Sequence, residues 1–155
     1  MKDEFNIYLK NIEVTQDLAI KISKFVSKPT FIGLSGELGS GKTTFARFLI
    51  NSLANKKIKV LSPTFPIVQI YDLPKIKVWH FDLFRLNDKN ELFNLDLEIA
   101  LDECVIVEWP EIIEDFLPTE RIEMFFYDDR NYQKNVKIQI FGDKFKKLKR
   151  IENEY

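Results

Sequence analysis

The stretch GELGSGKTT, residues 36–44, constrains this chain more than any other part of its sequence. Gly36 is followed by four residues and then by Gly41, Lys42 and Thr43, which is the pattern of a phosphate-binding loop. The whole chain has only 5 glycines, and Gly36, Gly39 and Gly41 are three of them. The stretch therefore predicts a turn whose backbone N–H groups point at phosphate oxygens.

The segments on both sides of the loop fit this prediction. Residues 30–35, TFIGLS, form a short apolar run that is typical of a buried strand. Residues 42–54 place apolar side chains at helical spacing. A helix that begins at Gly41 or Lys42 directs the positive end of its dipole at the same anion.

The residue types of the loop suit phosphate and magnesium chemistry. A lysine at position 42 reaches the β- and γ-phosphates, and the hydroxyl of Thr43 is a ligand for Mg²⁺. The residues that we expect to contact the nucleotide here are Glu37, Leu38, Gly39, Ser40, Gly41, Lys42, Thr43 and Thr44.

Strands and helices alternate through the first two thirds of the chain. Strands are expected over 4–12, 30–35, within 62–73, and over 75–84, 104–110, 121–129 and 135–142, and helices over 15–28, 42–54, 87–103 (in one or two pieces) and 111–118. This order predicts an α/β fold, a P-loop NTPase-like three-layer sandwich with a mainly parallel sheet and late antiparallel edge strands. We expect one domain over residues 1–155, with Thr15 as a helix N-cap and residues 144–155 as a surface tail.

Composition excludes several classes of function. Lys and Arg total 23 and Asp and Glu total 24, so a broad nucleic-acid surface is not expected. Cys104 is the only cysteine, which excludes an intramolecular disulfide and fits a reducing compartment; we expect it to be buried and inert. No apolar run approaches the length of a membrane span, and the expected location is the cytoplasm.

A Mg²⁺ ion at such a loop needs a second anchor, and two carboxylates end neighbouring strands. Glu108 ends the apolar run CVIVE, and Asp82 ends KVWHFD. We favour Glu108 as the direct or water-mediated metal partner. Asp82 is expected either to bind a water on the metal or to orient the attacking water, because ligands lie beyond the carboxyl ends of parallel strands.

Three further residues have more than one interpretation. Thr64, in SPTF, is either a sensor of the γ-phosphate or a turn residue. His80, the only histidine, is either catalytic or structural, and we favour the structural role because phosphoryl transfer depends more on positioning than on a general base. Trp109 fits either the core or a surface that closes over the nucleotide or a partner.

Four blocks in this order, GELGSGKTTFARFL, SPTF, HFDLFRL and VEWPE, resemble the TsaE (formerly YjeE) family. The resemblance covers residues 30–112 closely. It implies an ATPase, weak on its own, that is required for threonylcarbamoyladenosine (t6A) modification of adenosine 37 in tRNA. It implies ATP and Mg²⁺ as cofactors, and TsaB and TsaD as partners, with hydrolysis resetting the TsaB–TsaD assembly between turnovers. Contact with tRNA would be indirect, although the basic stretch KFKKLKR leaves direct contact open.

The family motifs also imply roles for single residues. Lys42 and Thr43 match the nucleotide and Mg²⁺ residues, and Thr15 matches a threonine that lies near the nucleotide. Thr64, Asp82 and Glu108 fall in the matched blocks, so that the candidate catalytic residues are Lys42, Thr64, Asp82 and Glu108. The chain departs from the family at Phe84, where tyrosine is common, and before the last strand, where Arg130 or Lys134 would replace an arginine pair.

Other classes of protein that carry a phosphate loop fit this sequence less well. A small-molecule kinase, which remains the alternative, commonly needs an arginine-bearing lid, but the arginines here are scattered and no lid-like insertion is visible. A GTPase would need an Asp-x-x-Gly and an Asn-Lys-x-Asp motif, and neither occurs. Intact Lys42, Thr43 and Glu108 argue against a binding module with a vestigial loop.

Overall fold

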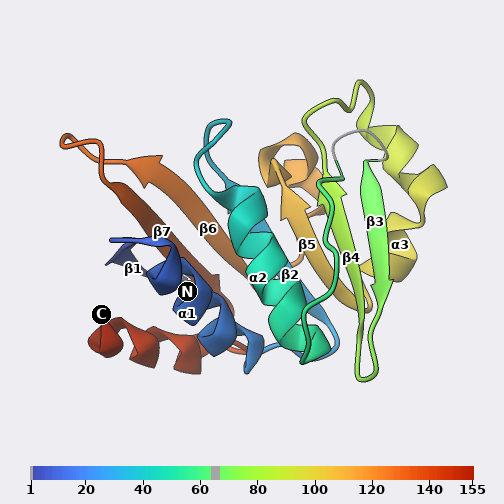
Figure 1. The fold of residues 1–155 in the computed structure, drawn as a ribbon. Coiled ribbons are helices and arrows are strands. Elements are labelled where there is room, and N and C mark those ends of the chain that lie inside the picture. Colours follow the sequence, from blue (N-terminus) through green and yellow to red (C-terminus); the bar gives the residue numbers. More distant parts are fainter. Residues whose placement is uncertain (1, 64–66) are drawn as a thin grey trace.

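A seven-stranded sheet runs through the part of the chain that the structure describes (Figure 1). The structure is a computed structural model, and it describes residues 2–63 and 67–155. Across the sheet the strands are β1 (Lys2–Tyr8), β7 (Lys134–Phe141), β6 (Arg121–Asp128), β2 (Thr30–Ser35), β5 (Cys104–Glu108), β4 (Lys77–Asp82) and β3 (Val68–Asp72).

The four middle strands are parallel, and the outer ones are antiparallel. β2 pairs in parallel with β5 and β6, and β5 pairs in parallel with β4. β7 is antiparallel to β6, β1 to β7, and β3 to β4. The predicted mainly parallel sheet with late antiparallel pairing is confirmed. β7 is not an edge strand, however, because the N-terminal strand β1 pairs along its whole length.

Helices cover both faces of this sheet and complete the predicted three layers (Figure 1). One face packs against α1 (Ile12–Ser23), α2 (Lys42–Ala54) and the 3-10 helix η3 (Lys146–Glu154). The other face packs against η1 (Lys89–Leu95), α3 (Leu97–Ala100) and η2 (Pro110–Phe116).

Strand β5 shows why the middle of the sheet has an uninterrupted apolar sequence. Ile106 belongs to the core under α1 and α2, whereas Val105 and Val107 belong to the core under α3. All five residues of β5 are buried, as expected for a parallel strand with helices on both sides. Only at its last residue, Glu108, does a charged side chain replace the apolar ones.

Helix α1 begins earlier than the sequence indicated. The prediction of Thr15 as its N-cap is wrong: Asn11 is the N-cap, and its Oδ1 accepts from the Val14 N–H at 3.0 Å. Asparagine is at least as good an N-cap as threonine. The helix therefore starts after Asn11, which comes first along the chain after β1. Thr15 lies inside α1 and is buried. The region 87–103 does form two helical pieces.

The last residues also differ from the prediction. Residues 144–155 are not a surface tail, because η3 buries Phe145, Leu148 and Ile151 against β1 and β7. Side chains three residues apart line up on one side of a 3-10 helix, so these apolar residues form one row while the lysines face solvent. No helix in the described ranges is long and apolar enough to cross a bilayer.

Candidate nucleotide-binding site

The phosphate loop connects β2 to α2 at the centre of the sheet. Gly41 precedes the helix with a φ of 114°, and no side chain of the described residues makes a capping hydrogen bond there. The first N–H groups of α2 and the positive end of its dipole therefore stay available to an anion. Gly36, at the start of the loop, also has a positive φ, of 136°.

Lys42 is folded back under its own loop. Its side chain is buried, and Nζ donates to the carbonyl oxygens of Gly36, at 2.5 Å, and Glu37, at 2.8 Å. Burial lowers the pKa of Lys42, while the carboxylates of Glu108, Asp82 and Glu111 act in the opposite direction. A partly desolvated ammonium held at a helix N-terminus interacts strongly with phosphate charge.

Thr43 and Glu108 meet beside the loop. The Thr43 hydroxyl donates to Oε1 of Glu108 at 2.8 Å, and Glu108 is only 2% exposed. Since a hydroxyl has one proton and two lone pairs, this bond leaves the Thr43 oxygen free to coordinate a cation. The second carboxylate oxygen of Glu108 lies 2.7 Å from Nε2 of His80.

Asp82 lies directly beside Glu108. The two residues are register partners at the ends of the parallel strands β4 and β5. Asp82 is 5% exposed, and its Oδ1 accepts from the backbone N–H of Phe84 at 3.0 Å. Two carboxylates are thus presented at one edge of the sheet, next to the N-terminus of α2.

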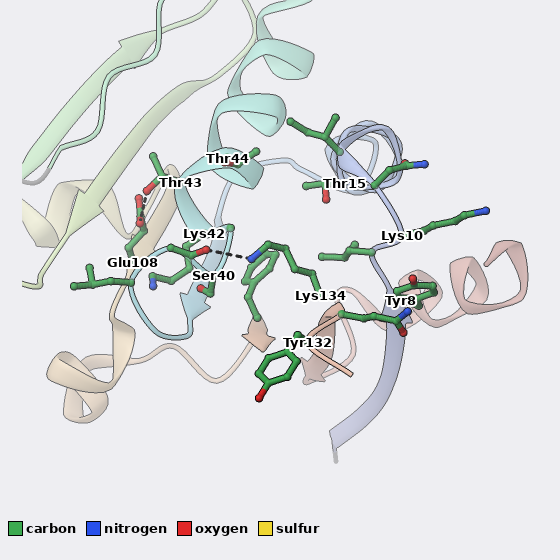
Figure 2. Close-up of a pocket in the computed structure, with 18 of the residues that line it drawn as sticks. Tyr8, Lys10, Thr15, Ser40, Lys42, Thr43, Thr44, Glu108, Tyr132 and Lys134 are labelled. Atoms are coloured by element: carbon green, nitrogen blue, oxygen red, sulfur yellow. Dashed lines mark hydrogen bonds between the residues drawn. The ribbon is translucent and has the colours of Figure 1, made fainter. Parts of the chain in front are cut away.

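A pocket of about 720 Å³ opens over the phosphate loop, a size that suits a small-molecule ligand. Figure 2 shows Thr43 and Glu108 on one side of it and Tyr8, Lys10 and Thr15 on the other. The lining residues are Tyr8, Leu9, Lys10, Asn11, Ile12, Thr15, Leu38, Gly39, Ser40, Gly41, Lys42, Thr43, Thr44, Ser62, Asp82, Glu108, Trp109, Phe126, Tyr132, Gln133 and Lys134.

The β6–β7 hairpin closes a third side of the pocket. Lys134 donates from Nζ to the Gly39 carbonyl at 3.2 Å, so the hairpin contacts the phosphate loop directly (Figure 2). The same ammonium lies 3.7 Å from Asp128. Of the two replacements considered for the missing arginine pair, Lys134 lines the pocket and Arg130 does not.

Trp109 forms part of the wall next to Glu108. It has a φ of 65°, in the left-handed region, and its backbone N–H donates to the Leu34 carbonyl at 3.1 Å. Its ring lies 4.4 Å from Nζ of Lys42 and packs against Phe84 with the ring centres 5.1 Å apart. Trp109 is half-buried and is therefore a wall of the pocket rather than a core residue.

The structure brings most of the predicted site residues to this one pocket. Those that line it are Leu38, Gly39, Ser40, Gly41, Lys42, Thr43, Thr44, Thr15, Asp82 and Glu108. Glu37 is exposed and lines a smaller adjoining pocket instead, although its carbonyl oxygen accepts from Lys42. Thr64 lies outside the described residues.

Sequence reasoning missed the contact between His80 and Glu108 and the contributions of Tyr8, Lys10 and Tyr132 to the pocket. A signal for His80 did exist: it is two residues before Asp82 on one strand, so both side chains point to the same face. Nothing in the sequence marks the other three, because their place depends on how distant segments meet.

The donor set fits Mg²⁺. Thr43 and Glu108 offer the hard oxygen atoms that this ion prefers. Within residues 2–63 and 67–155 no group of three or more His, Cys, Asp or Glu side chains is arranged to hold a metal. A Mg²⁺ ion here would therefore share one or two protein ligands with phosphate oxygens and water, as is usual at nucleotide sites.

The fold and the site together define a P-loop NTPase-like protein, with a buried loop lysine, an adjacent threonine and a carboxylate at the end of the neighbouring parallel strand. The structure is similar to a crystal structure of YdiB from Bacillus subtilis, with a TM-score of 0.77 over 99% of this chain and 97% of that one. The sequences are 24% identical, so this similarity concerns the fold.

Sequence comparison identifies the family. The family model described as "Threonylcarbamoyl adenosine biosynthesis protein TsaE" matches residues 9–136. The chain is 34% identical to the TsaE protein of Rickettsia bellii, over 95% of this chain and 94% of the relative, and 30% identical to that of Bacillus subtilis, over 89% and 87%. The chain belongs to the TsaE family, which confirms the resemblance drawn from the four sequence blocks.

Proposed function

We propose that this chain binds ATP with Mg²⁺ and hydrolyses it in the biosynthesis of tRNA threonylcarbamoyladenosine. The Thr43–Glu108 hydrogen bond beside the buried Lys42 is the observation that supports this most directly. It brings together a hydroxyl oxygen and a carboxylate next to the phosphate loop, and these two groups would hold a Mg²⁺ ion that accompanies the nucleotide. The TsaE proteins that this chain matches are named for the same pathway.

Each residue of the site has a part in this proposal. Lys42 and the N–H groups at the start of α2 bind the phosphates. Thr43 and Glu108 would hold the Mg²⁺ ion, which would neutralise charge on the phosphates. Asp82 accepts a hydrogen bond from a water, on the metal or in line for attack. The space between the side with Lys10 and Thr15 and the side with Tyr132 leaves room for the nucleoside.

Among its described lining residues the site has groups to position phosphate and Mg²⁺ but no arginine to stabilise a transition state, which suits a subunit that works with others. In the proposed cycle, TsaB and TsaD bind this chain in its ATP form, and hydrolysis resets their assembly between rounds of threonylcarbamoyl transfer. tRNA would then be reached through these partners. The exposed side chain of Leu38 lines the pocket, and the exposed ring of Phe84 packs on Trp109 in its wall. A partner could sense the nucleotide through these two side chains.

Two variants test nucleotide binding and hydrolysis. Lys42→Ala should weaken ADP binding about 10-fold or more, because it removes a charge-assisted contact to phosphate. Glu108→Ala should still bind nucleotide in EDTA but lose Mg²⁺-dependent hydrolysis by about 10- to 100-fold. Glu98→Ala, an exposed change on α3, is the matched control. A Glu108→Ala chain that hydrolyses ATP at the unmodified rate would show that the metal assignment is wrong.

A pull-down tests the partners. The chain is mixed with TsaB and TsaD from the same source, with ATP, with ADP and without nucleotide. Capture that depends on ATP supports the proposed cycle. Capture that is the same under all three conditions, or no capture at all, contradicts it and favours the small-molecule kinase.

A further inference from the structure

Glu108 is held at both of its carboxylate oxygens, and the second contact comes from a residue outside the pocket. Oε1 accepts from Thr43 at 2.8 Å, and Oε2 lies 2.7 Å from Nε2 of His80. His80 is fully buried and does not line the pocket. It can therefore influence a bound nucleotide only through another side chain.

The strand register explains how this contact arises. On the parallel pair β4–β5, His80 is level with Ile106, and Asp82 is level with Glu108. His80 and Glu108 are thus diagonal neighbours on the same face, within reach of a long side chain. The contact joins two rigid strands in the middle of the sheet, which fixes the imidazole firmly.

The hydrogen on the imidazole must lie on Nε2. Among the described residues, Nδ1 of His80 is buried without a hydrogen-bond partner. A hydrogen on Nδ1 would be a buried, unpaired donor, whereas a bare nitrogen there is better tolerated. The ring with its hydrogen on Nε2 is therefore a donor to Glu108, and it satisfies an oxygen that is almost entirely shielded from water.

We propose that His80 is a positioning residue for the Mg²⁺ site, acting by holding Oε2 of Glu108 so that Oε1 stays directed at Thr43. The inference rests on the proposed Mg²⁺-nucleotide function and adds to it a residue that touches neither the ion nor the nucleotide. A glutamate carboxylate rotates easily about its last torsion angle. Without the donor on Oε2, Glu108 would no longer be fixed in the orientation that leaves the lone pairs of Thr43 free for a cation.

Three substitutions separate the hydrogen bond from simple packing. His80→Gln places an amide N–H close to the position of the imidazole Nε2 and should keep the bond. His80→Asn carries the same amide on a side chain one methylene shorter, which cannot reach Glu108. His80→Leu has nearly the volume of histidine but no donor. The Gln and Asn variants form the matched pair.

The readout is metal binding itself rather than turnover. Binding of Mn²⁺ to the ADP complex is measured by the loss of the free Mn²⁺ electron paramagnetic resonance signal. ADP affinity is measured separately in EDTA, and urea unfolding checks that each variant folds. Partners of a metal ligand typically contribute about 10- to 100-fold to metal affinity. We therefore expect His80→Asn and His80→Leu to weaken Mn²⁺ binding about 10-fold or more.

The other measurements decide what such a loss means. ADP affinity in EDTA should stay within about twofold of the unmodified chain for every variant, and His80→Gln should keep Mn²⁺ affinity within about threefold. If Asn or Leu leaves Mn²⁺ affinity unchanged, or if Gln weakens it as much as Asn does, the inference is overturned. If His80→Leu does not fold, the Gln and Asn pair decides.

The same experiment separates this inference from the proposed function. An unmodified chain that binds ADP and Mn²⁺ together supports the proposed function, whatever the variants do. An unmodified chain that binds neither overturns both. Binding by the unmodified chain with equal Mn²⁺ affinity in all variants overturns the role of His80 alone.

Discussion

Gly36 and Gly39 lie in the same loop with a positive φ, but their surroundings differ. A Cβ on Gly36 would lie 2.5 Å from the backbone oxygen of Phe126, and its φ is 136°. A Cβ on Gly39 would meet nothing within 4 Å, and its φ is 78°. The first position therefore requires glycine because of both conformation and space, and the second because of conformation alone.

We predict that Gly36→Ala destabilises the fold by about 2–4 kcal/mol, because the backbone of the loop or of β6 has to move. The shift would displace the carbonyl that accepts from Lys42 and so abolish ADP binding. Gly39→Ala should destabilise by only about 1 kcal/mol and keep binding. Urea unfolding and calorimetric titration of both variants check this, and equal effects at the two positions would contradict it.

Cys104 illustrates a reactive group that the fold makes inert. It is fully buried at the start of β5, and burial raises the pKa of its thiol to about 12. At pH 8 the reactive thiolate is then on the order of 1 in 10,000 of the folded molecules. We predict that a disulfide reagent labels the folded chain at least about 100-fold more slowly than the urea-unfolded chain. Equal labelling rates in the two states would exclude this burial.

At the level of elements, the sequence was informative where structure is local. The strand, loop and helix over residues 30–54 follow directly from glycine spacing and apolar periodicity, and the structure has all three. The start of α1 was misjudged because Asn11 and Thr15 are both good N-caps. Propensity alone does not rank two such residues, since the choice depends on where β1 ends.

Contacts between elements that are distant along the chain could not be predicted from the sequence. His80 reaches Glu108 across 28 positions, and Lys134 reaches Gly39 across 95. Both depend on the order of strands in the sheet, which periodicity does not determine. The prediction for residues 144–155 failed for a related reason. The lysines of this segment suggested a solvent-exposed tail, because the surface on β1 and β7 against which its apolar row packs is not visible in the sequence.

The packing of η3 gives a prediction at this scale. Leu148 is fully buried in the core under η3, whereas Lys147 is exposed. Leu148→Ala should lower the free energy of unfolding by about 2–5 kcal/mol through lost apolar contact and the cavity it leaves. Lys147→Ala, the neighbouring control, should change it by no more than about 0.5 kcal/mol. If denaturant unfolding finds the two variants equal, η3 does not pack as described.

Over the whole molecule, the pocket depends on parts of the chain that are far apart in sequence, including the ends of β4 and β5 at Asp82 and Glu108. The phosphate loop lies at the centre, the β1–α1 connection on one side and the β6–β7 hairpin on another. The N-terminal strand reaches the site only because it pairs with β7. The pocket over the phosphate loop is therefore a property of the complete sheet.

The charges around this pocket lead to a prediction about partners. Among the described residues that line it, the cations are Lys10, Lys42 and Lys134, and none is an arginine. P-loop enzymes gain about 10³- to 10⁵-fold in turnover from an arginine that stabilises the transition state, often supplied by a partner. We therefore expect the isolated chain to hydrolyse ATP slowly, at about 0.01 per second or less.

Adding TsaB and TsaD should raise this rate if they complete the site, and we expect an increase of about 10-fold or more. Steady-state release of phosphate, with and without the two proteins, measures it. Lys42→Ala is the control, because a contaminating ATPase would leave its rate unchanged.

Turnover of about 1 per second or faster by the isolated chain would mean that its own side chains already stabilise the transition state. The proposed coupling to TsaB and TsaD would then act on product release or through the exposed ring of Phe84, which packs on Trp109 above Lys42.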